Sequence, residues 1–355
     1  MMSRFQAVTI LGTAFLFALI CGGCGGADDD PIFSSVGSYG DIAVITSNPD
    51  LYEAATPFLN KLSPDVTFVI KKEETYRIQH YTGSEWKNGR NYRNLMFLVR
   101  WGDGGAVEKE LRSLLRQETI DKLVSGNGDV VTLRDPYFRN QLAYIAVSVD
   151  RNLLASVLNR EAKALGDTLA ADIYRRMARD NRREGVNTAA VRRDWSRYGF
   201  HLQIPVVFKE NQFEPRGFPG VEWLYTSAEG TSDGLTYAWT EADDPDAVLA
   251  DRDALLKLRG DMGETMHDAS ELNDLTLQWS EETVAGRPAV RLDGAWASRK
   301  AGVGGPFRTY FFAVPEREVV LAVDLLVYAP NREKMDDMRR LRAIVETLSF
   351  EQPGV

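Results

Sequence analysis

Apolar positions recur with two different periods along the chain, and the period assigns each segment to a strand or a helix. Short apolar or alternating runs, which are typical of strands, occupy residues 41–46, 66–71, 94–101 and 142–149. After Asp150, apolar residues recur three and four apart, a spacing that only a helix can place on one face. The core face of this predicted helix comprises Leu154, Leu158, Ala162, Leu165, Leu169, Ile173 and Met177. Strands and helices therefore alternate in the first half of the chain.

Residues typical of helix starts and ends predict two more helices in this half. Asn48 and Pro49 suit the start of a helix that we expect to end near Leu62. The glycine-rich residues 102–105 open a further predicted helix, which Gly126 would end. Its apolar side comprises Leu111, Leu114, Leu115 and Leu123.

The second half repeats this plan in a looser form. A predicted strand at residues 234–241 leads through an acidic loop to a helix, and a strand at 319–329 leads to another. The apolar residues of these two helices are Leu249, Leu255, Leu256 and Leu258, then Met335, Met338, Leu341, Val345 and Leu348. We therefore expect two related α/β units, at residues 39–197 and 198–355.

Hairpin patterns decide the fold class. Residues 275–284 and 288–298 flank a turn at Ala285 and Gly286, and residues 307–314 add another strand. Runs of hairpins favour an α+β fold over a doubly wound parallel sheet. The sequence thus predicts two related units with mainly antiparallel sheets and helices packed on one face.

The first residues have the pattern of an export signal. Residues 7–20 are apolar or small, follow Arg4, and as a helix would extend roughly 21 Å, which is too short to cross a hydrocarbon core of about 30 Å. Small residues and a thiol follow directly, as in a bacterial lipoprotein signal. Gly22 and Gly23 precede Cys24, so we predict a signal peptide at residues 1–23 and fatty acylation, palmitate included, on Cys24.

A tether follows the predicted anchor. Residues 24–38 are small, polar or acidic, with three consecutive aspartates at Asp28, Asp29 and Asp30. They fit a spacer that holds the folded part off the membrane. The alternative is a signal for the cell surface, because such acids after the lipidated Cys are similar to export signals of Bacteroidota lipoproteins. We therefore predict a lipid-anchored protein of the bacterial envelope, in the outer membrane, and leave its face open.

Composition excludes several classes of protein. The chain has 42 Lys and Arg against 51 Asp and Glu, a formal net charge of −9, which argues against nucleic acid as a partner. It has two cysteines, and with Cys24 acylated and Cys21 cleaved off, neither disulfides nor thiol catalysis remain. No nucleophile elbow and no phosphate-binding loop occurs. The sequence therefore favours a non-catalytic protein without a cofactor, although carboxylate catalysis leaves no short motif.

Four groups of residues resemble ligand-binding sites but have simpler explanations. The histidines, His80, His201 and His267, lack metal-ligand spacing, so we predict no metal. The acidic residues 243–253 lack the glycine and glutamate of a calcium loop, and Asp244 and Pro245 suit a helix start instead. Residues 302–306 suit a turn before a strand better than an anion cradle. Four tryptophans fall in strand patterns and fit the core better than a sugar-stacking surface: Trp101, Trp223, Trp239 and Trp296.

One stretch has an excess of positive charge. Arginines outnumber acids between residues 175 and 197, on a chain that is acidic overall. Solvated helix ends and ion pairs explain this pattern. The alternative is a contact site for an anionic envelope polymer, a lipid headgroup or an acidic envelope protein, and its candidate residues are Arg175, Arg176, Arg179, Arg182 and Arg183.

Short motifs along the chain resemble a known family. They comprise residues 37–41, Ile204-Pro205, Trp223, residues 294–296, residues 304–307 and residues 328–330. On these the chain resembles the uncharacterised Bacteroidota lipoproteins of domain-of-unknown-function family 4837. The second half is similar to the PsbP-like α/β sandwich, on the basis of Ile204-Pro205, Gly286-Arg287-Pro288 at a hairpin and a C-terminal helix ending in Leu348-Ser349-Phe350. The resemblance implies an envelope lipoprotein and transfers no activity.

Three hypotheses for the function follow. The first is an envelope lipoprotein that binds or scaffolds another component without catalysis, which the absence of catalytic signatures favours. The second is a carboxylate-dependent glycan-active enzyme or other hydrolase. The third is a carrier of a small ligand with a pocket between the two units.

Overall fold

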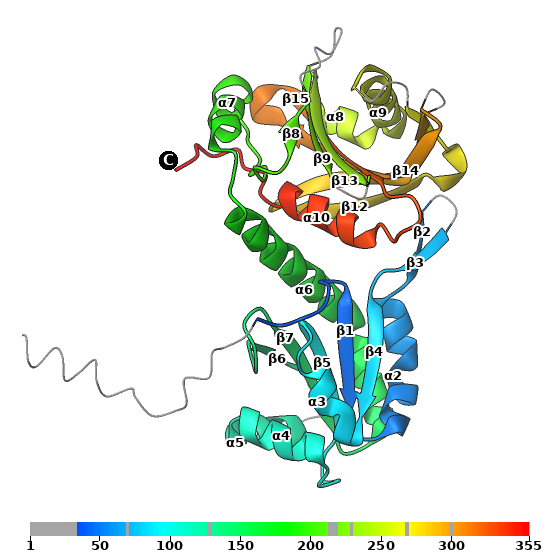
Figure 1. Ribbon diagram of the computed structural model, residues 1–355, viewed down its shortest axis with the longest axis vertical. Helices are drawn as coiled ribbons and strands as arrows, with labels where there is room; N and C mark the ends of the chain where they lie inside the picture. The colour runs from blue at the N-terminus through cyan, green and yellow to red at the C-terminus, as the bar shows by residue number, and fades with distance from the viewer. Residues whose placement is uncertain are drawn as a thin grey trace, which may run out of the picture.

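The computed structural model describes residues 34–68, 71–125, 130–211, 219–227, 230–266, 270–298 and 301–354 (Figure 1). The predicted signal peptide, Cys24, the first part of the tether, Gly126 and His267 lie outside the described residues. None of the helices in the described ranges is long and apolar enough to cross a bilayer. The described chain forms two large sheets with their helices and a separate two-stranded hairpin, and one long helix extends from the first half to the second (Figure 1).

The first sheet is mostly parallel. Its five strands stand in the order β4 (Arg77–Thr82), β1 (Asp41–Thr46), β5 (Asn94–Arg100), β7 (Leu142–Ser148) and β6 (Val130–Arg134). The pairs β1/β4, β1/β5 and β5/β7 are parallel, and only β6 runs antiparallel to its neighbour. Strands β1, β5 and β7 are buried along almost their whole length, which explains their nearly continuous apolar sequences.

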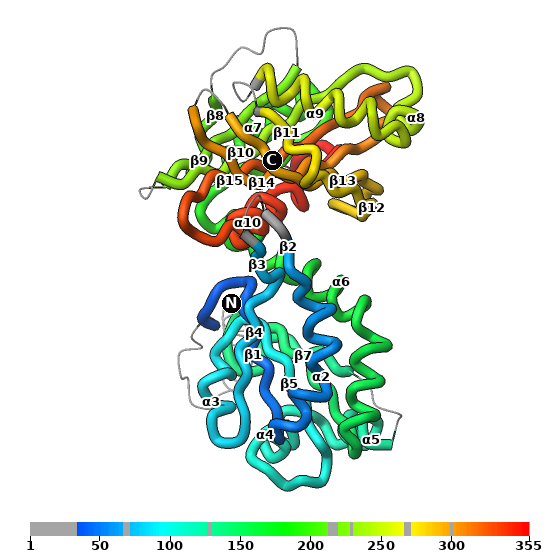
Figure 2. The backbone as a smooth tube through the Cα atoms, turned by 90° about the vertical axis from the view of Figure 1, so that its right-hand side faces the viewer, coloured from blue at the N-terminus to red at the C-terminus, as the bar shows by residue number. Residues whose placement is uncertain are grey.

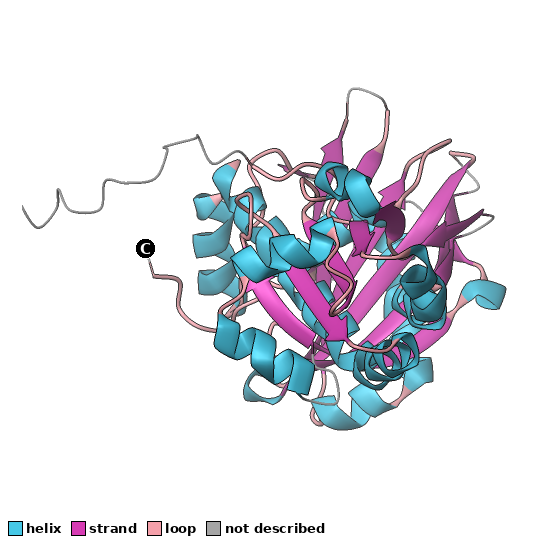
Figure 3. Ribbon diagram, turned by 90° about the horizontal axis from the view of Figure 1, so that it is seen from below, coloured by secondary structure: helices cyan, strands magenta, loops and turns pink. Residues whose placement is uncertain are grey.

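Helices cover both faces of this sheet (Figure 3). On one face, α2 (Pro49–Leu62) and α6 (Arg151–Arg183) pack against Ile42 and Val44 of β1. On the other face, α3 (Trp86–Gly89), α4 (Ala106–Leu114) and α5 (Gln117–Ser125) pack against the alternate side chains Ala43 and Ile45. A short 3-10 turn, η1 (Gly83–Glu85), precedes α3.

The second sheet has eight strands, and all of its pairs are antiparallel. Its order is β11-β13-β14-β15-β10-β9-β8, and β12 pairs with the part of β13 that β11 leaves open. The strands are β8 (Lys209–Glu210), β9 (Gly220–Thr226), β10 (Ser232–Glu241), β11 (Ser270–Leu272), β12 (Gln278–Val284), β13 (Arg287–Ser298), β14 (Val303–Val314) and β15 (Val319–Tyr328). Two 3-10 turns, η2 (Asp274–Thr276) and η3 (Pro315–Arg317), lie between them.

This sheet also has helices on both faces. The face that carries Leu235, Tyr237 and Val323 packs against α7 (Thr188–Tyr198) and α10 (Met335–Val345). The opposite face packs against α8 (Pro245–Ala250) and α9 (Arg252–Met266). Asp244 accepts a hydrogen bond from the Ala247 amide at 3.0 Å, so the predicted N-cap of α8 is confirmed.

The predicted α+β class is confirmed, and the structure corrects three of its details. Helices cover both faces of each sheet instead of one. The two halves do not repeat one plan, because the first sheet is mostly parallel and the second antiparallel. The helix predicted after residue 105 is two helices, since the chain is extended at Leu115 between α4 and α5. The break at Leu115 could not be predicted because the spacing of apolar residues indicates which face of a helix is buried but does not indicate where the helix ends.

Two elements connect the halves (Figure 2). Helix α6 contacts α2 in the first half and α10 in the second. The hairpin of β2 (Asp65–Phe68) and β3 (Lys71–Glu74) reaches the second half, where the Glu73 carboxylate accepts the amides of Lys334 and Met335 at 2.8 and 3.0 Å. These are orphan donors at the start of α10, whose own N-cap side chain makes no capping bond. A residue of the first half therefore caps a helix of the second.

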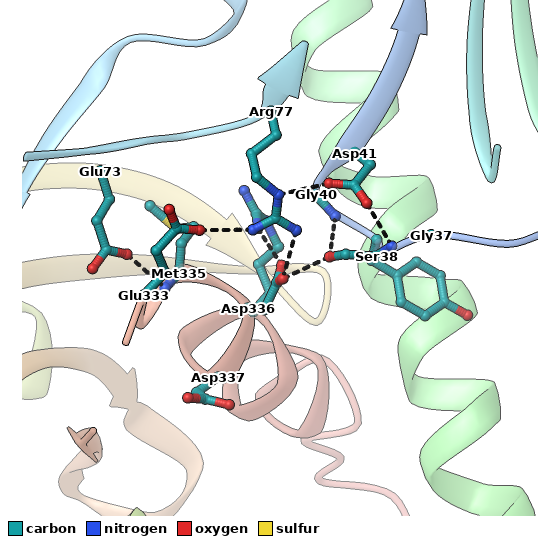
Figure 4. A network of polar contacts seen from close by, with 12 residues as sticks. Gly37, Ser38, Gly40, Asp41, Glu73, Arg77, Glu333, Met335, Asp336 and Asp337 are labelled. Carbon is teal, nitrogen blue, oxygen red and sulfur yellow. Dashed lines mark hydrogen bonds and ion pairs between the residues drawn. The ribbon is translucent and has the colours of Figure 1, made fainter. Parts of the chain in front are cut away.

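An ionic network fixes this junction (Figure 4). The guanidinium of Arg77 contacts Asp41 at 2.6 Å, and Glu333 and Asp336 at 2.9 Å each. The Ser38 hydroxyl donates to the same Asp336 carboxylate at 2.6 Å. Burial raises the pKa of Asp336, but the hydrogen bond from Ser38 and the charges of Arg339 and Arg77 outweigh it, so the pKa is lowered. The start of the first sheet is thus held against the start of α10.

Candidate functional site

The second half of α6 carries an exposed arginine stripe. Arg175, Arg179 and Arg182 are four and three residues apart, a spacing that places all three side chains on one side of a helix. They are exposed, whereas Ile173 and Met177 face the core as their apolar period predicts. The same helix thus buries one side and displays three guanidinium groups on another.

Two cavities adjoin the stripe, and Arg175 and Arg182 line both. The larger, of about 410 Å³, lies between α6 and the second half of the chain. Its lining residues are Ala171, Arg175, Ala178, Arg182, Gln203, Glu346 and Thr347. The smaller, of about 260 Å³, lies between α6 and the β6–β7 connection, and its lining residues are Arg134, Asp135, Asn140, Gln141, Arg175, Arg176, Arg179 and Arg182. We call the two cavities together the arginine groove.

A buried carboxylate organises the arginines. Asp172 is 2% exposed and forms ion pairs with Arg134, Arg175 and, at 2.6 Å, with Arg176. Burial raises the pKa of Asp172, but the charge of Arg176 and the hydrogen bonds from Arg134 and Arg175 outweigh it, so its pKa is lowered. One negative charge is therefore shared among three guanidinium groups, which leaves the groove with an excess of positive charge.

The neighbouring acid, Asp180, is engaged elsewhere. It accepts the Tyr39 hydroxyl and contacts Arg183 at 3.3 Å and Arg93 at 3.9 Å. Burial and the bond to Asp180 raise the pKa of Tyr39 to about 12, which keeps its hydroxyl a donor. Among the described residues, Arg179 has no hydrogen-bond or ion-pair partner, and Arg182 reaches only Gln203, at 3.4 Å.

The structure separates the five arginines named from the sequence. Arg175, Arg179 and Arg182 lie together along the groove. Arg176 is 4% exposed, and it donates to the carbonyl of Asn140 at 2.8 Å, so only its edge borders the smaller cavity. Arg183 is exposed and lines neither cavity.

Sequence reasoning missed Arg134. It comes from β6, at a position 41 residues before Arg175, and reaches the groove because β6 pairs with β7 next to α6. Nothing in its local sequence indicates this, since Arg134 simply ends an alternating strand. Guanidinium groups bind carboxylates and phosphates in bidentate geometry, so the groove has the chemistry of an anion site.

The other candidates remain apart. His80 contacts the Thr46 hydroxyl at 2.9 Å in the first sheet, whereas His201 pairs with Ser349 in the second half. In the described ranges, no group of three His, Cys, Asp or Glu residues could hold a metal. Gly302 lies in a turn with positive φ, but β14 begins at Val303, so residues 303–306 of the predicted turn belong to the strand instead. Trp223 is buried, and the other three strand tryptophans are partly buried against the cores.

A second carboxylate in an unusual setting lies in β10. Asp233 is 2% exposed, and its nearest cation is Arg340, with a separation of 3.9 Å between Oδ2 and Nη1. Burial raises the pKa of Asp233 to about 7; the Asp337 charge adds to this rise, and Arg340 and Arg332 oppose it. Sequence reasoning did not find this residue, because an Asp at the start of a strand usually faces solvent.

This setting predicts a pH-dependent stability. The folded chain holds a proton on Asp233 that the unfolded chain releases near pH 4, so the unfolding free energy should fall between about pH 4 and pH 7, by at most about 4 kcal/mol. Asp233→Asn should remove that part of the slope and stabilise the protein at pH 8, as measured by urea unfolding across this range. The exposed control Asp246→Asn should leave the curve unchanged. An unaltered slope in Asp233→Asn would contradict the assignment.

Comparisons with known proteins bear on the second half of the chain. Residues 190–347 match the family model described as "Domain of unknown function (DUF4837)", which agrees over this segment with the resemblance to that family drawn from the sequence. No curated protein matches the chain. Among solved structures, the chain is similar to LpqN, which is "involved in cell envelope biogenesis of Mycobacterium tuberculosis", with 18% identity and a TM-score of 0.29 over 42% of this chain and 82% of that one. All the groove arginines precede the matched segment.

Proposed function

We propose that the protein is a lipid-anchored component of the bacterial cell envelope that binds an anionic partner through the arginine groove, without catalysis. The anchor rests on the apolar leader and on Cys24 after two glycines. The observation that carries the binding function is the row of Arg175, Arg179 and Arg182 along two adjoining cavities. Anionic envelope polymers, lipid headgroups and acidic proteins all present the groups that such a row binds.

The balance of charge supports binding rather than a purely structural role. Five arginines line the groove, whereas its lining contains two acids, Asp135 and Glu346. Glu346 is held by Arg342 at 2.8 Å and by the amide of Ala285 at 2.9 Å. Arginines that only keep a helix soluble can lie on any exposed surface, whereas those of the arginine stripe border two cavities.

Binding of a short linear polyphosphate, followed by calorimetry, tests the proposal. Arg179→Glu/Arg182→Glu should weaken binding roughly tenfold or more, since each guanidinium supplies charge-assisted hydrogen bonds. The matched control is Arg151→Glu/Lys163→Glu, which makes the same charge change at exposed positions in the first half of the same helix. It should bind as the unaltered chain does. Affinity should also fall as salt is raised.

Two results would overturn the proposal. One is equal affinity of the two double variants for polyphosphate. The other is turnover of an envelope glycan by the purified chain that is lost on changing one acid, which would establish the hydrolase hypothesis. Uptake of a neutral small ligand into the larger cavity, with no effect of the arginines, would favour the carrier hypothesis instead.

A further inference from the structure

We infer that the anion bound by the arginine groove is the headgroup of an anionic lipid in the same membrane that holds the protein's own anchor. The groove would then lie against the bilayer surface and fix the orientation of the molecule. This inference rests on the proposed function and names the partner of that site. Four observations carry it: the place where the described chain begins, the length of chain before it, the charge of the groove and the size of its cavities.

The described chain begins beside the groove. Ser34 pairs with Arg139, and the Ser35 hydroxyl donates to the carbonyls of Arg139 and Asn140 at 2.9 and 3.3 Å. Asn140 lines the smaller cavity, and its carbonyl also accepts from Arg176 of α6. The first contacts of the described chain therefore lie on the same β6–β7 connection that forms one wall of the groove.

The chain before Ser34 is short. Ten residue steps separate it from Cys24, and at about 3.3–3.6 Å per residue they span at most roughly 36 Å. A membrane that holds Cys24 is therefore never far from Ser34. Of the surfaces of the molecule, the one beside Ser34 is the one that this length brings nearest to the bilayer.

Charge selects this face for contact. The whole chain has a formal net charge of −9, so an anionic bilayer repels most orientations of it. The groove presents Arg175, Arg179 and Arg182 with one buried carboxylate, Asp172, among them. Arginine near an anionic bilayer surface gains roughly fivefold in binding per side chain. Anchored to the same surface, the groove meets headgroups at a high effective concentration, so weak individual contacts are enough.

The cavities fit a headgroup and not a whole lipid. Their volumes are about 260 and 410 Å³, the first below and the second near the lower end of the range of roughly 300–1,000 Å³ for ligand pockets. Their lining comprises arginines, the two carboxylates Asp135 and Glu346, amides and small side chains, and it contains no large apolar side chain that could hold an acyl chain. A lipid phosphate entering the groove would therefore leave its tails in the bilayer, as a surface contact requires.

The experiment uses the acylated full chain reconstituted into vesicles. With Cys24 acylated, Ala171→Cys supplies a single thiol at an exposed position that lines the larger cavity. A fluorophore placed there reports its distance from a quencher attached to lipid headgroups. Quenching is compared between vesicles of phosphatidylcholine and vesicles of equimolar phosphatidylcholine and phosphatidylglycerol. The matched control position is Lys257→Cys, exposed on α9 on the far side of the second sheet.

The inference predicts stronger quenching at residue 171 in the phosphatidylglycerol vesicles, and no such gain at residue 257. Adding Arg179→Glu/Arg182→Glu should lower the population with the groove on the membrane about 25-fold or more and abolish the gain. Adding Arg151→Glu/Lys163→Glu should preserve it. High salt should remove it.

Equal quenching in the two vesicle types, or equal quenching at both label positions, overturns the inference. If polyphosphate still binds in an arginine-dependent way, the groove serves a soluble anion or an acidic protein, and the proposed function stands. If polyphosphate binding is also absent, the proposed function fails with it. A mass spectrum of the native protein without acyl chains on Cys24 removes the anchor and overturns the inference independently.

Discussion

Asp324→Ala should lower the free energy of unfolding by about 3–5 kcal/mol, because it removes the carboxylate of a fully buried ion pair. Asp324 of β15 and Arg259 of α9 are both 0% exposed, and Arg259 Nε lies 3.0 Å from Asp324 Oδ1. The Thr309 hydroxyl donates to the same carboxylate oxygen at 2.6 Å. The measurement is chemical denaturation followed by tryptophan fluorescence.

A matched pair on the same helix provides the control. Lys257 and Asp261 of α9 are also in contact, at 2.5 Å, but both are exposed. Asp261→Ala should therefore cost no more than about 1 kcal/mol, the range of solvated ion pairs. The double change Arg259→Met/Asp324→Leu should recover most of the loss, since an apolar pair of similar volume avoids the cost of burying charge. Equal losses for Asp324→Ala and Asp261→Ala would contradict this account of the buried pair.

Asp172→Ala should also destabilise the protein by about 3–5 kcal/mol, and in addition should strengthen anion binding. The loss arises at Arg176, which stays buried at 4% exposure when its carboxylate is removed. The gain arises at Arg134 and Arg175, which are half exposed and would lose the acid that now neutralises them. We expect the affinity for polyphosphate to rise severalfold while the denaturation midpoint falls.

Two controls separate these effects. Arg134→Ala removes one exposed partner and leaves Asp172 paired, so it should cost about 1 kcal/mol or less and should weaken polyphosphate binding. The pKa of Asp172 is lowered in the folded chain, so the stability it contributes is present above the unfolded pKa near 4 and is lost only as pH falls through the lower folded value. Unfolding of the unaltered chain and of Asp172→Ala should therefore differ by a constant amount between pH 6 and pH 8. A fall in both stability and anion affinity would show that Asp172 holds the groove in shape and does not compete with its ligand.

Local features of the fold could be predicted because each depends on neighbours in sequence. The strand β1 has the bounds expected from its apolar run, and α2 begins at Pro49 and ends at Leu62 as expected. Asp150 accepts the amides of Asn152 and Leu153 and so caps α6, and a helix after Asp150 is what the apolar spacing predicts. Apolar period, proline and a capping carboxylate act within one or two turns, so their effects can be read without knowing the rest of the chain.

Pairing and charge burial could not be predicted in the same way. The parallel order around β1 depends on which distant strands meet, and nothing in the sequence of β4 or β5 names β1 as its neighbour. The arginine stripe follows from helical spacing, yet the burial of Asp172 and the arrival of Arg134 depend on β6 packing beside α6. Asp233 likewise lies in an ordinary strand pattern, and its burial is set by residues of α10 one hundred positions later.

The helix α6 and the β2–β3 hairpin have a further consequence for what counts as a module in this protein. Ala343 of α10 belongs to the core around α2 and α6, and Val66 of the hairpin packs on the core of the second sheet. Each half therefore contributes an apolar side chain to the core of the other, across the boundary of the segment that the family model matches. Fusion, shuffling or truncation at the boundary of that segment would expose apolar side chains on both parts of the chain. We therefore expect the two halves to be inherited together.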